Sequence, residues 1–425
     1  MSVRVVFWAL VAGLLAGLAL APAGPVCAAP GPGDNLRVEL LTIGPGPATW
    51  SRFGHSALRF EDVRGRGDVV FDFGTFDDHQ GNVIGRFLQG RLQYYLSVST
   101  FRDTVADYRG QGRRIEAQEL RLTGRQRLRL FRRLRRLVRP ENRQYRYHHF
   151  TNNCATRIRD ELDRVLGGPL RRQLRRVPAG TYRDWIRRAT RGAPWFHLGF
   201  DLILTHADRS ITLWEAAFAP EALHDGVARV TLAAATGGGR VPLVRATRTV
   251  CRGAGFSSAG SDSRAWFLVG LWLLSLLGLA PLLAPGWPRL TRGIAGGALV
   301  LWGLAQTLGC VAILFLQFYS TLAQFRGNPN LAVFAPVGPL YIWSGLRLAT
   351  GWRGGARPPR WLFAVLLAYL LTILVLHMLP GLSCPWPELW ITTFVLQVGF
   401  FLVLAWARQT SSAEASDRFT ERRSA

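Results

Sequence analysis

The feature that most constrains this chain is a series of five apolar segments in its C-terminal part. They cover about Trp266 to Leu283, Gly293 to Tyr319, Leu331 to Leu348, Trp361 to Leu379 and Leu389 to Trp406. Each is close to the roughly 20 residues that an α-helix needs to cross a bilayer. Residues 263–407 are therefore expected to form an all-α bundle of about five transmembrane helices. The third segment is the weakest, because Pro336 and Pro339 interrupt it.

The arginines in the connecting loops predict how these segments are oriented. The loops that follow the first, third and fifth segments are basic, with Arg289, Arg292, Arg347, Arg353, Arg357, Arg360, Arg408, Arg418, Arg422 and Arg423. The other two loops contain Arg326 alone. Because cytoplasmic loops carry an excess of basic residues, residues 408–425 are expected to be a cytoplasmic tail. Residues before 263 are then expected on the other side of the membrane.

The N-terminal residues 1–29 have the pattern of a secretory signal peptide, which is either cleaved or kept as an anchor. Arg4 precedes the apolar run Val5 to Ala21, and Val26-Cys27-Ala28 fits a small-residue cleavage site. This pattern predicts that residues 30–262 are extracytoplasmic, in agreement with the arginine distribution.

The chain is strongly basic, with a formal net charge of +25, and all of its basic residues are arginine. Such a charge is typical of binding to nucleic acid or to an anionic membrane surface, although a GC-rich genome also favours arginine. The membrane segments argue against nucleic acid. An amphipathic helix with an arginine-covered face is expected over Thr123 to Val138, with a capping box of Thr123 and Gln126. Its basic face is either solvated or in contact with anionic headgroups.

The five cysteines, at positions 27, 154, 251, 310 and 384, have no metal-binding spacing. We therefore expect neither a structural zinc site nor a cofactor. Cys251 and Cys384 would both face the outside, where they either form a disulfide or remain two separate thiols. In both cases Cys154 stays free.

Alternating apolar residues predict strands in the extracytoplasmic part. They lie at Leu36 to Ile43, from His55 onward, at Val69 to Phe73 and at Leu92 to Val98, with an extended segment at Glu116 to Leu122. Helical patterns between and after them indicate an α+β domain.

Cys154 is the best candidate for a nucleophile. It follows Asn153 and opens an amphipathic segment that ends at Gly167-Gly168, which predicts a cysteine at, or one turn inside, the start of a helix. The helix dipole and the free backbone N–H groups at that point favour a thiolate over a thiol.

A thiol nucleophile needs a base and a group that orients the base. His55, which ends a turn and opens a strand, is the preferred base for Cys154, and Asp72 on the next strand is the expected orienting group. Other residues are expected to support the site or contact the substrate, namely Asn153, Arg52, Tyr147 and His149.

Four motifs together resemble the Lnb-type lipoprotein N-acyltransferases. They are Trp50-Ser-Arg-Phe-Gly-His-Ser-Ala-Leu-Arg59, Phe71-Asp-Phe-Gly-Thr-Phe-Asp77, Pro140-Glu-Asn-Arg-Gln-Tyr-Arg-Tyr147 and Asn153-Cys-Ala-Thr-Arg-Ile-Arg-Asp160. The resemblance implies a permuted papain-like (NlpC-type) domain at residues 30–262, with Cys154 as nucleophile and His55 as base.

The same resemblance implies the reaction and its location. An acyl chain would move from a phospholipid donor, through a thioester on Cys154, to the N-terminal cysteine amine of a diacylglyceryl lipoprotein. The protein would be a multi-pass protein of the bacterial inner (cytoplasmic) membrane with its N-terminal domain in the periplasm. Two alternatives are a membrane-anchored papain-like peptidase or amidase of the cell wall, and a non-catalytic membrane scaffold.

Overall fold

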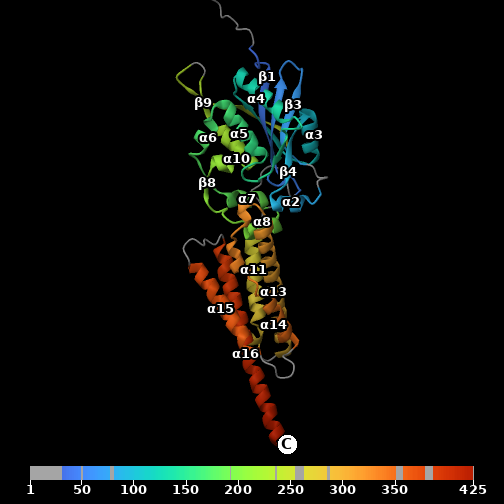
Figure 1. Ribbon diagram of the computed structural model, residues 1–425, viewed down its shortest axis with the longest axis vertical. Coiled ribbons are helices and arrows are strands. Elements are labelled where there is room, and N and C mark those ends of the chain that lie inside the picture. Colours follow the sequence, from blue (N-terminus) through green and yellow to red (C-terminus); the bar gives the residue numbers. More distant parts are fainter. Residues whose placement is uncertain are drawn as a thin grey trace, which may run out of the picture.

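The computed structural model describes residues 31–48, 51–76, 81–191, 193–234, 237–253, 263–284, 288–350, 358–378 and 386–424. Within them, an α/β part stands at one end of an elongated helical region (Figure 1). The expected signal peptide, Cys27 and Cys384 lie outside the described residues.

Seven strands form one sheet in the order β11-β5-β1-β2-β3-β4-β6, and every neighbouring pair is antiparallel. The strands are β1 (Leu36–Ile43), β2 (His55–Asp62), β3 (Asp68–Phe76), β4 (Gln93–Thr100), β5 (Ile115–Leu120), β6 (Gln144–Arg146) and β11 (Val244–Cys251). The sheet confirms the expected α+β class. Because β11 pairs with β5, the end of the domain returns to the edge of the sheet.

Helices cover both faces of this sheet, and the alternation of side chains along each strand explains why. On one face, the cross-strand neighbours Leu40, Leu58 and Phe71 pack beneath α4 (Gly124–Leu137) and α5 (Cys154–Leu166). On the other face, Leu41, Ala57 and Val70 pack beneath α3 (Phe101–Gly110). A sheet that is buried on both faces needs apolar residues at successive positions, as β1 has.

The remaining elements of the α/β part are short. They are α2 (Val83–Gln89), α6 (Pro169–Leu174), α7 (Tyr182–Thr190), α8 (Pro194–Ile203), α9 (Leu213–Ala216) and α10 (Pro220–Arg229), with β7 (Pro178–Thr181), β8 (Ser210–Thr212), β9 (Thr231–Ala233) and β10 (Arg240–Pro242). The capping box of Thr123 and Gln126 at α4 is confirmed. Because α4 lies at the end of the α/β part away from the helical region (Figure 1), its position favours a solvated basic face.

The helical region contains α11 (Ser263–Gly278), α12 (Ala280–Leu283), α13 (Pro288–Tyr319), η3 (Ala323–Phe325), η4 (Pro329–Ala332), α14 (Gly338–Thr350), α15 (Arg360–Met378) and α16 (Pro387–Ser424). Two helices, Arg289–Tyr319 and Pro387–Thr410, are long and apolar enough to cross a membrane. Arg264–Gly278 and Arg360–Leu376 are shorter apolar helices. The α-helix of the third segment starts only at Gly338, where Pro339 fits the first turn, and has 13 residues.

The starts of α11 and α16 and the end of α13 lie at the same end of the helical region, next to the α/β part. Arg264 at the start of α11 lies 3.4 Å from the carboxylate of Glu388 at the start of α16. Thr321, just after α13, donates a hydrogen bond of 2.7 Å to the carbonyl of Gln89. The start of α13, which carries Arg289 and Arg292, therefore lies at the end of the bundle far from the α/β part (Figure 1).

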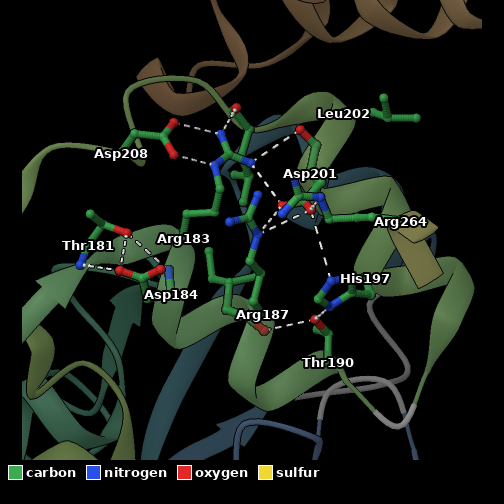
Figure 2. Close-up of polar contacts among 12 residues, drawn as sticks. Thr181, Arg183, Asp184, Arg187, Thr190, His197, Asp201, Leu202, Asp208 and Arg264 are labelled. Atoms are coloured by element: carbon green, nitrogen blue, oxygen red, sulfur yellow. Dashed lines mark hydrogen bonds and ion pairs between the residues drawn. The ribbon is translucent and has the colours of Figure 1, made fainter. Parts of the chain in front are cut away.

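A buried carboxylate, that of Asp201 on α8, joins the α/β part to the helical region (Figure 2). It accepts hydrogen bonds from Arg183 at 3.2 Å and from Arg187 at 2.9 Å, both on α7. Arg264 of α11 lies 3.6 Å away. The side chains of Arg183 and Asp201 are only 1% and 2% exposed. The charges of the cluster are therefore stabilised by one another rather than by water.

The segment that follows α13 is attached to the end of α8 by polar contacts. The carbonyl of Leu202 accepts hydrogen bonds from the side-chain amides of Asn328 and Asn330, at 2.7 and 2.9 Å. The backbone N–H of Thr205 donates to the carbonyl of Gln324 at 2.8 Å. These bonds satisfy polar groups that would otherwise be buried without partners.

Candidate active site

Cys154 occupies the first position of α5, as the sequence predicts. Asn153 is the N-cap, its side-chain oxygen accepts from the backbone of Thr156, and the two residues form a capping box. The helix ends at Gly167, whose φ of 82° is the left-handed conformation that glycine adopts without strain. Cys154 is a free, half-buried thiol at a helix start, where the first backbone N–H groups have no partner within the helix itself.

Two further hydrogen bonds hold Asn153 in place. Its side-chain amide donates to the carbonyl of His149 at 2.7 Å and to the carbonyl of Phe218 at 2.9 Å. The residue is 5% exposed. It therefore ties the start of α5 to two separate segments, which fixes the position of Cys154.

His55 and Asp72 lie on the adjacent strands β2 and β3 and contact each other directly. Nε2 of His55 is 2.7 Å from Oδ1 of Asp72, which also accepts from the backbone of Gly74. A Cβ at position 74 would lie 2.1 Å from Cε1 of His55, so the ring fits only beside glycine. Within the described residues Nδ1 of His55 makes no hydrogen bond, which leaves it available to a substrate or a thiol.

The charges of this site act on one another. Burial opposes the charged form of His55, but the carboxylate of Asp72, together with Tyr108 and Cys154, raises the pKa of the imidazole well above its ordinary value of 6.5. Burial likewise opposes the charge of Asp72, yet His55 and the Gly74 N–H lower the pKa of that carboxyl. No hydrogen bond joins Cys154 to His55 in the described part of the chain, as is common in enzymes without substrate.

Three tyrosines, of which Tyr145 is buried and Tyr94 and Tyr147 are half-buried, lie close enough to Cys154 for their charges to act on one another. Tyr94 and Tyr147 stack with ring centroids 4.3 Å apart, and Tyr145 lies beside them. Burial, and after it the charges of neighbouring groups that include Cys154, raises the pKa values of all three phenols. These rings keep their hydroxyl protons and form an aromatic wall. Tyr147, a predicted supporting residue, therefore lies close to Cys154.

Arg113 is a member of the site that sequence reasoning missed. It is 4% exposed, and its Nε donates to the carbonyl of Gly44 at 2.8 Å. Its guanidinium lies over the ring of Tyr108, 4.7 Å from the centroid, and its buried Nη2 has no hydrogen-bond partner in the described residues. Cys154 and Asp72 both act on its charge. No motif marks this arginine among so many others in the chain.

Two of the predicted supporting residues, His149 and Arg52, make no hydrogen bond to His55 or Asp72 within the described residues. His149 makes no contact with His55 or Asp72; the amide of Gln324, in η3, donates to its Nε2 at 3.1 Å. Burial, with a smaller effect of His148, lowers the pKa of His149 to about 3, so this ring is neutral. Arg52 lies in the turn before β2, and its buried Nε has no hydrogen-bond partner in the described residues.

Groups that could hold a metal ion, with three or more His, Cys, Asp or Glu side chains, do not occur among the described residues. Cys251 is a free, buried thiol. The disulfide considered for it would involve Cys384, which lies outside the described residues.

A comparison with protein families gave a match to the N-terminal part of the chain. Residues 32–188 match the family model of the Lnb N-terminal periplasmic domain. Neither the comparison with curated proteins nor that with solved structures gave a match. The matched segment contains Cys154, His55, Asp72 and Arg113, and it ends before α8 and the helical region. Residues 32–188, which include most of the seven-stranded sheet and the start of α5, are therefore similar to the Lnb N-terminal periplasmic domain.

Proposed function

We propose that this protein is a lipoprotein N-acyltransferase that works through a thioester on Cys154. The observation that carries the proposal is the placement of Cys154 at the start of α5, where its charge and the His55–Asp72 pair act on one another. An Lnb-type domain built on apolar helices supports it. An imidazole that takes the proton of a nearby thiol, and is then stabilised as a cation by a carboxylate, is the arrangement that makes cysteine reactive.

In the first half-reaction, Sγ of Cys154 attacks the carbonyl carbon of a phospholipid ester. His55 takes the thiol proton at Nδ1 while Asp72 holds Nε2 and stabilises the resulting imidazolium. The first backbone N–H groups of α5 are suited to hold the oxyanion. The carbon–oxygen ester bond then breaks, the proton passes to the leaving alkoxide, and a lysophospholipid departs.

In the second half-reaction, the α-amine of a diacylglyceryl lipoprotein attacks the thioester carbonyl. The carbon–sulfur bond breaks, an amide forms, and the proton released by the amine returns through His55 to the Cys154 thiolate. The enzyme ends in its starting state. No oxidant, metal or nucleotide is needed for this balance.

The membrane arrangement that we propose has five spans in the bacterial inner membrane, with residues 30–262 as the periplasmic acyltransferase domain. The bundle end that carries Arg289 and Arg292 lies far from that domain, as the proposed orientation requires. Both substrates would be in the outer leaflet, so a thiol domain attached to the bundle meets them at the membrane surface.

The test is mass spectrometry of lipoprotein N-termini in a bacterial strain without other N-acyltransferases. Expression of the chain should produce N-acylated lipoproteins, and Cys154→Ala should abolish them. Cys251→Ala, which removes a free thiol outside the site, is the matched control and should retain them. Retained N-acylation in Cys154→Ala would refute the proposal. A changed pattern of cell-wall peptides instead would favour the peptidase alternative.

A further inference from the structure

A cavity remote from Cys154 lies between α4, α6 and the β9–β10 hairpin. Its volume is about 750 Å³. Its lining includes no aspartate or glutamate. It includes four arginines, namely Arg121, Arg172, Arg176 and Arg240. A concave site of this size is within the range that binds small molecules.

The four arginines have no carboxylate partner in the described part of the chain, unlike many others in the protein. Backbone carbonyls hold three of them in place instead. Nε of Arg121 donates to the carbonyl of Pro242 at 3.1 Å, and Nη1 of Arg172 donates to that of Gly167 at 2.9 Å. Nη2 of Arg240 donates to the carbonyl of Thr231 at 2.9 Å. Each guanidinium keeps other N–H groups that are not used within the described residues.

The walls of the cavity are braced, and part of them is apolar. The side-chain amide of Gln173 on α6 donates to the carbonyl of Thr231 at 2.8 Å, and its oxygen accepts from the backbone N–H of the same residue at 3.1 Å. Leu122, Leu166 and Leu232 contribute apolar surface. The four arginines are exposed to solvent, so a ligand can reach them directly.

From this arrangement we propose that the cavity binds an anionic ligand carrying two or more phosphate or carboxylate groups. Guanidinium groups match both kinds of oxyanion through paired hydrogen bonds. Unpaired cations that converge on one hollow, with no acidic residue among its lining, attract such a ligand and are neutralised by it. The apolar walls contact its carbon skeleton.

The place of the cavity in the fold restricts the source of this ligand. α4 and β9 lie at the end of the α/β part away from the helices (Figure 1). A lipid headgroup of the membrane around those helices does not reach this end. The ligand therefore comes from the extracytoplasmic solution.

The experiment is isothermal titration calorimetry of the full-length chain in detergent, with inorganic pyrophosphate and citrate as probes. Binding of at least one probe should be saturable and should weaken as sodium chloride is added. The two probes distinguish a preference for phosphate from one for carboxylate. Arg172→Gln combined with Arg240→Gln should weaken binding by at least about tenfold.

The matched control replaces Arg125 and Arg129, which are exposed on α4 and do not line the cavity, with glutamine. Its binding should equal that of the wild type. Arg176→Gln removes a lining side chain without a hydrogen bond in the described residues, so it tests the site even where the double variant folds poorly. The proposal is overturned by the absence of saturable binding, or by equal affinities in the cavity and control variants.

Discussion

Gln324, in the helical region, donates a hydrogen bond of 3.1 Å to the ring of His149, in the α/β part. The carbonyl of His149 accepts in turn from Asn153, which caps the helix of Cys154. Three consecutive contacts thus connect the helical region to the start of the nucleophile's helix. We infer that the hydrogen bond between Gln324 and His149 helps to position Cys154.

The first prediction concerns this connection. Gln324→Leu should slow lipoprotein N-acylation several-fold while the chain still folds, because His149 loses its partner and the cap of α5 becomes less fixed. Single-turnover acylation and iodoacetamide alkylation of Cys154 measure the effect. Gln317→Leu is the matched control, since Gln317 bonds to Gly327 and not to His149. Equal rates in the two variants would contradict the connection.

The second prediction is a dependence of stability on pH. The pKa of His55 is raised in the folded state, so the His55–Asp72 ion pair stabilises the protein fully below pH 6.5, and this contribution is lost as pH rises through the raised value. The difference in Tm between wild type and Asp72→Asn should therefore be largest at pH values below 6.5 and should shrink as the pH rises above 6.5.

Asp68→Asn is the control for that experiment. Asp68 pairs with Arg59, whose pKa is raised from an already high value, so its contribution should stay constant over the same interval. Thermal unfolding of the full-length chain in detergent gives both differences. If the difference in Tm between wild type and Asp72→Asn does not change with pH, the His55–Asp72 ion pair does not form.

The third prediction concerns Arg113. Its positive charge acts on Cys154, and a nearby cation favours the thiolate. Arg113→Met should therefore slow alkylation of Cys154 at neutral pH several-fold, whereas Arg113→Lys should retain most of the rate. Arg114→Met changes the exposed neighbour that pairs with Glu116 and should have no effect. Loss of reactivity in the lysine variant as well would indicate a structural role alone.

The fourth prediction concerns the buried charge cluster of Figure 2. Asp201→Ala leaves Arg183 and Arg187 without a shared carboxylate and should lower the free energy of unfolding by about 3–5 kcal/mol. Asp208→Ala removes a 41% exposed partner of the same Arg183 and should cost less than about 1 kcal/mol. Denaturant unfolding in detergent compares the two. Equal losses would contradict the assignment of Asp201 as the centre of the cluster.

Local patterns were sufficient to predict much of the α+β part. Alternating apolar residues predicted β1. An asparagine before an amphipathic segment and a glycine pair after it predicted α5, with its start known to within a turn and its end at Gly167. These signals lie within a few residues of the feature that they determine, so no tertiary information was needed. The contact between His55 and Asp72 was expected for a related reason, because the two residues lie on successive strands.

Other features depend on contacts between distant parts of the chain. Arg113 enters the site because β5 pairs with β1, and nothing near it in the sequence distinguishes it from other arginines. His149 was expected near the nucleophile for its chemistry. Its carbonyl does accept from Asn153, but its ring bonds to Gln324, which lies far away in the sequence in the segment after α13. The helix of the third apolar segment starts only at Gly338. Proline fits the first turn of a helix, as Pro339 does here, but disrupts a helix interior, so a helix that began at Leu331 would have contained both Pro336 and Pro339.

The contact between Gly74 and His55 has a consequence for how relatives of this chain should be judged. Any side chain at position 74 would push the imidazole away from Asp72, although all three predicted catalytic residues would still be present. A chain with alanine there would pass every search for the cysteine, the histidine and the aspartate. Its glycine, which carries no reactive group, is thus a better marker of a working copy than the reactive residues alone.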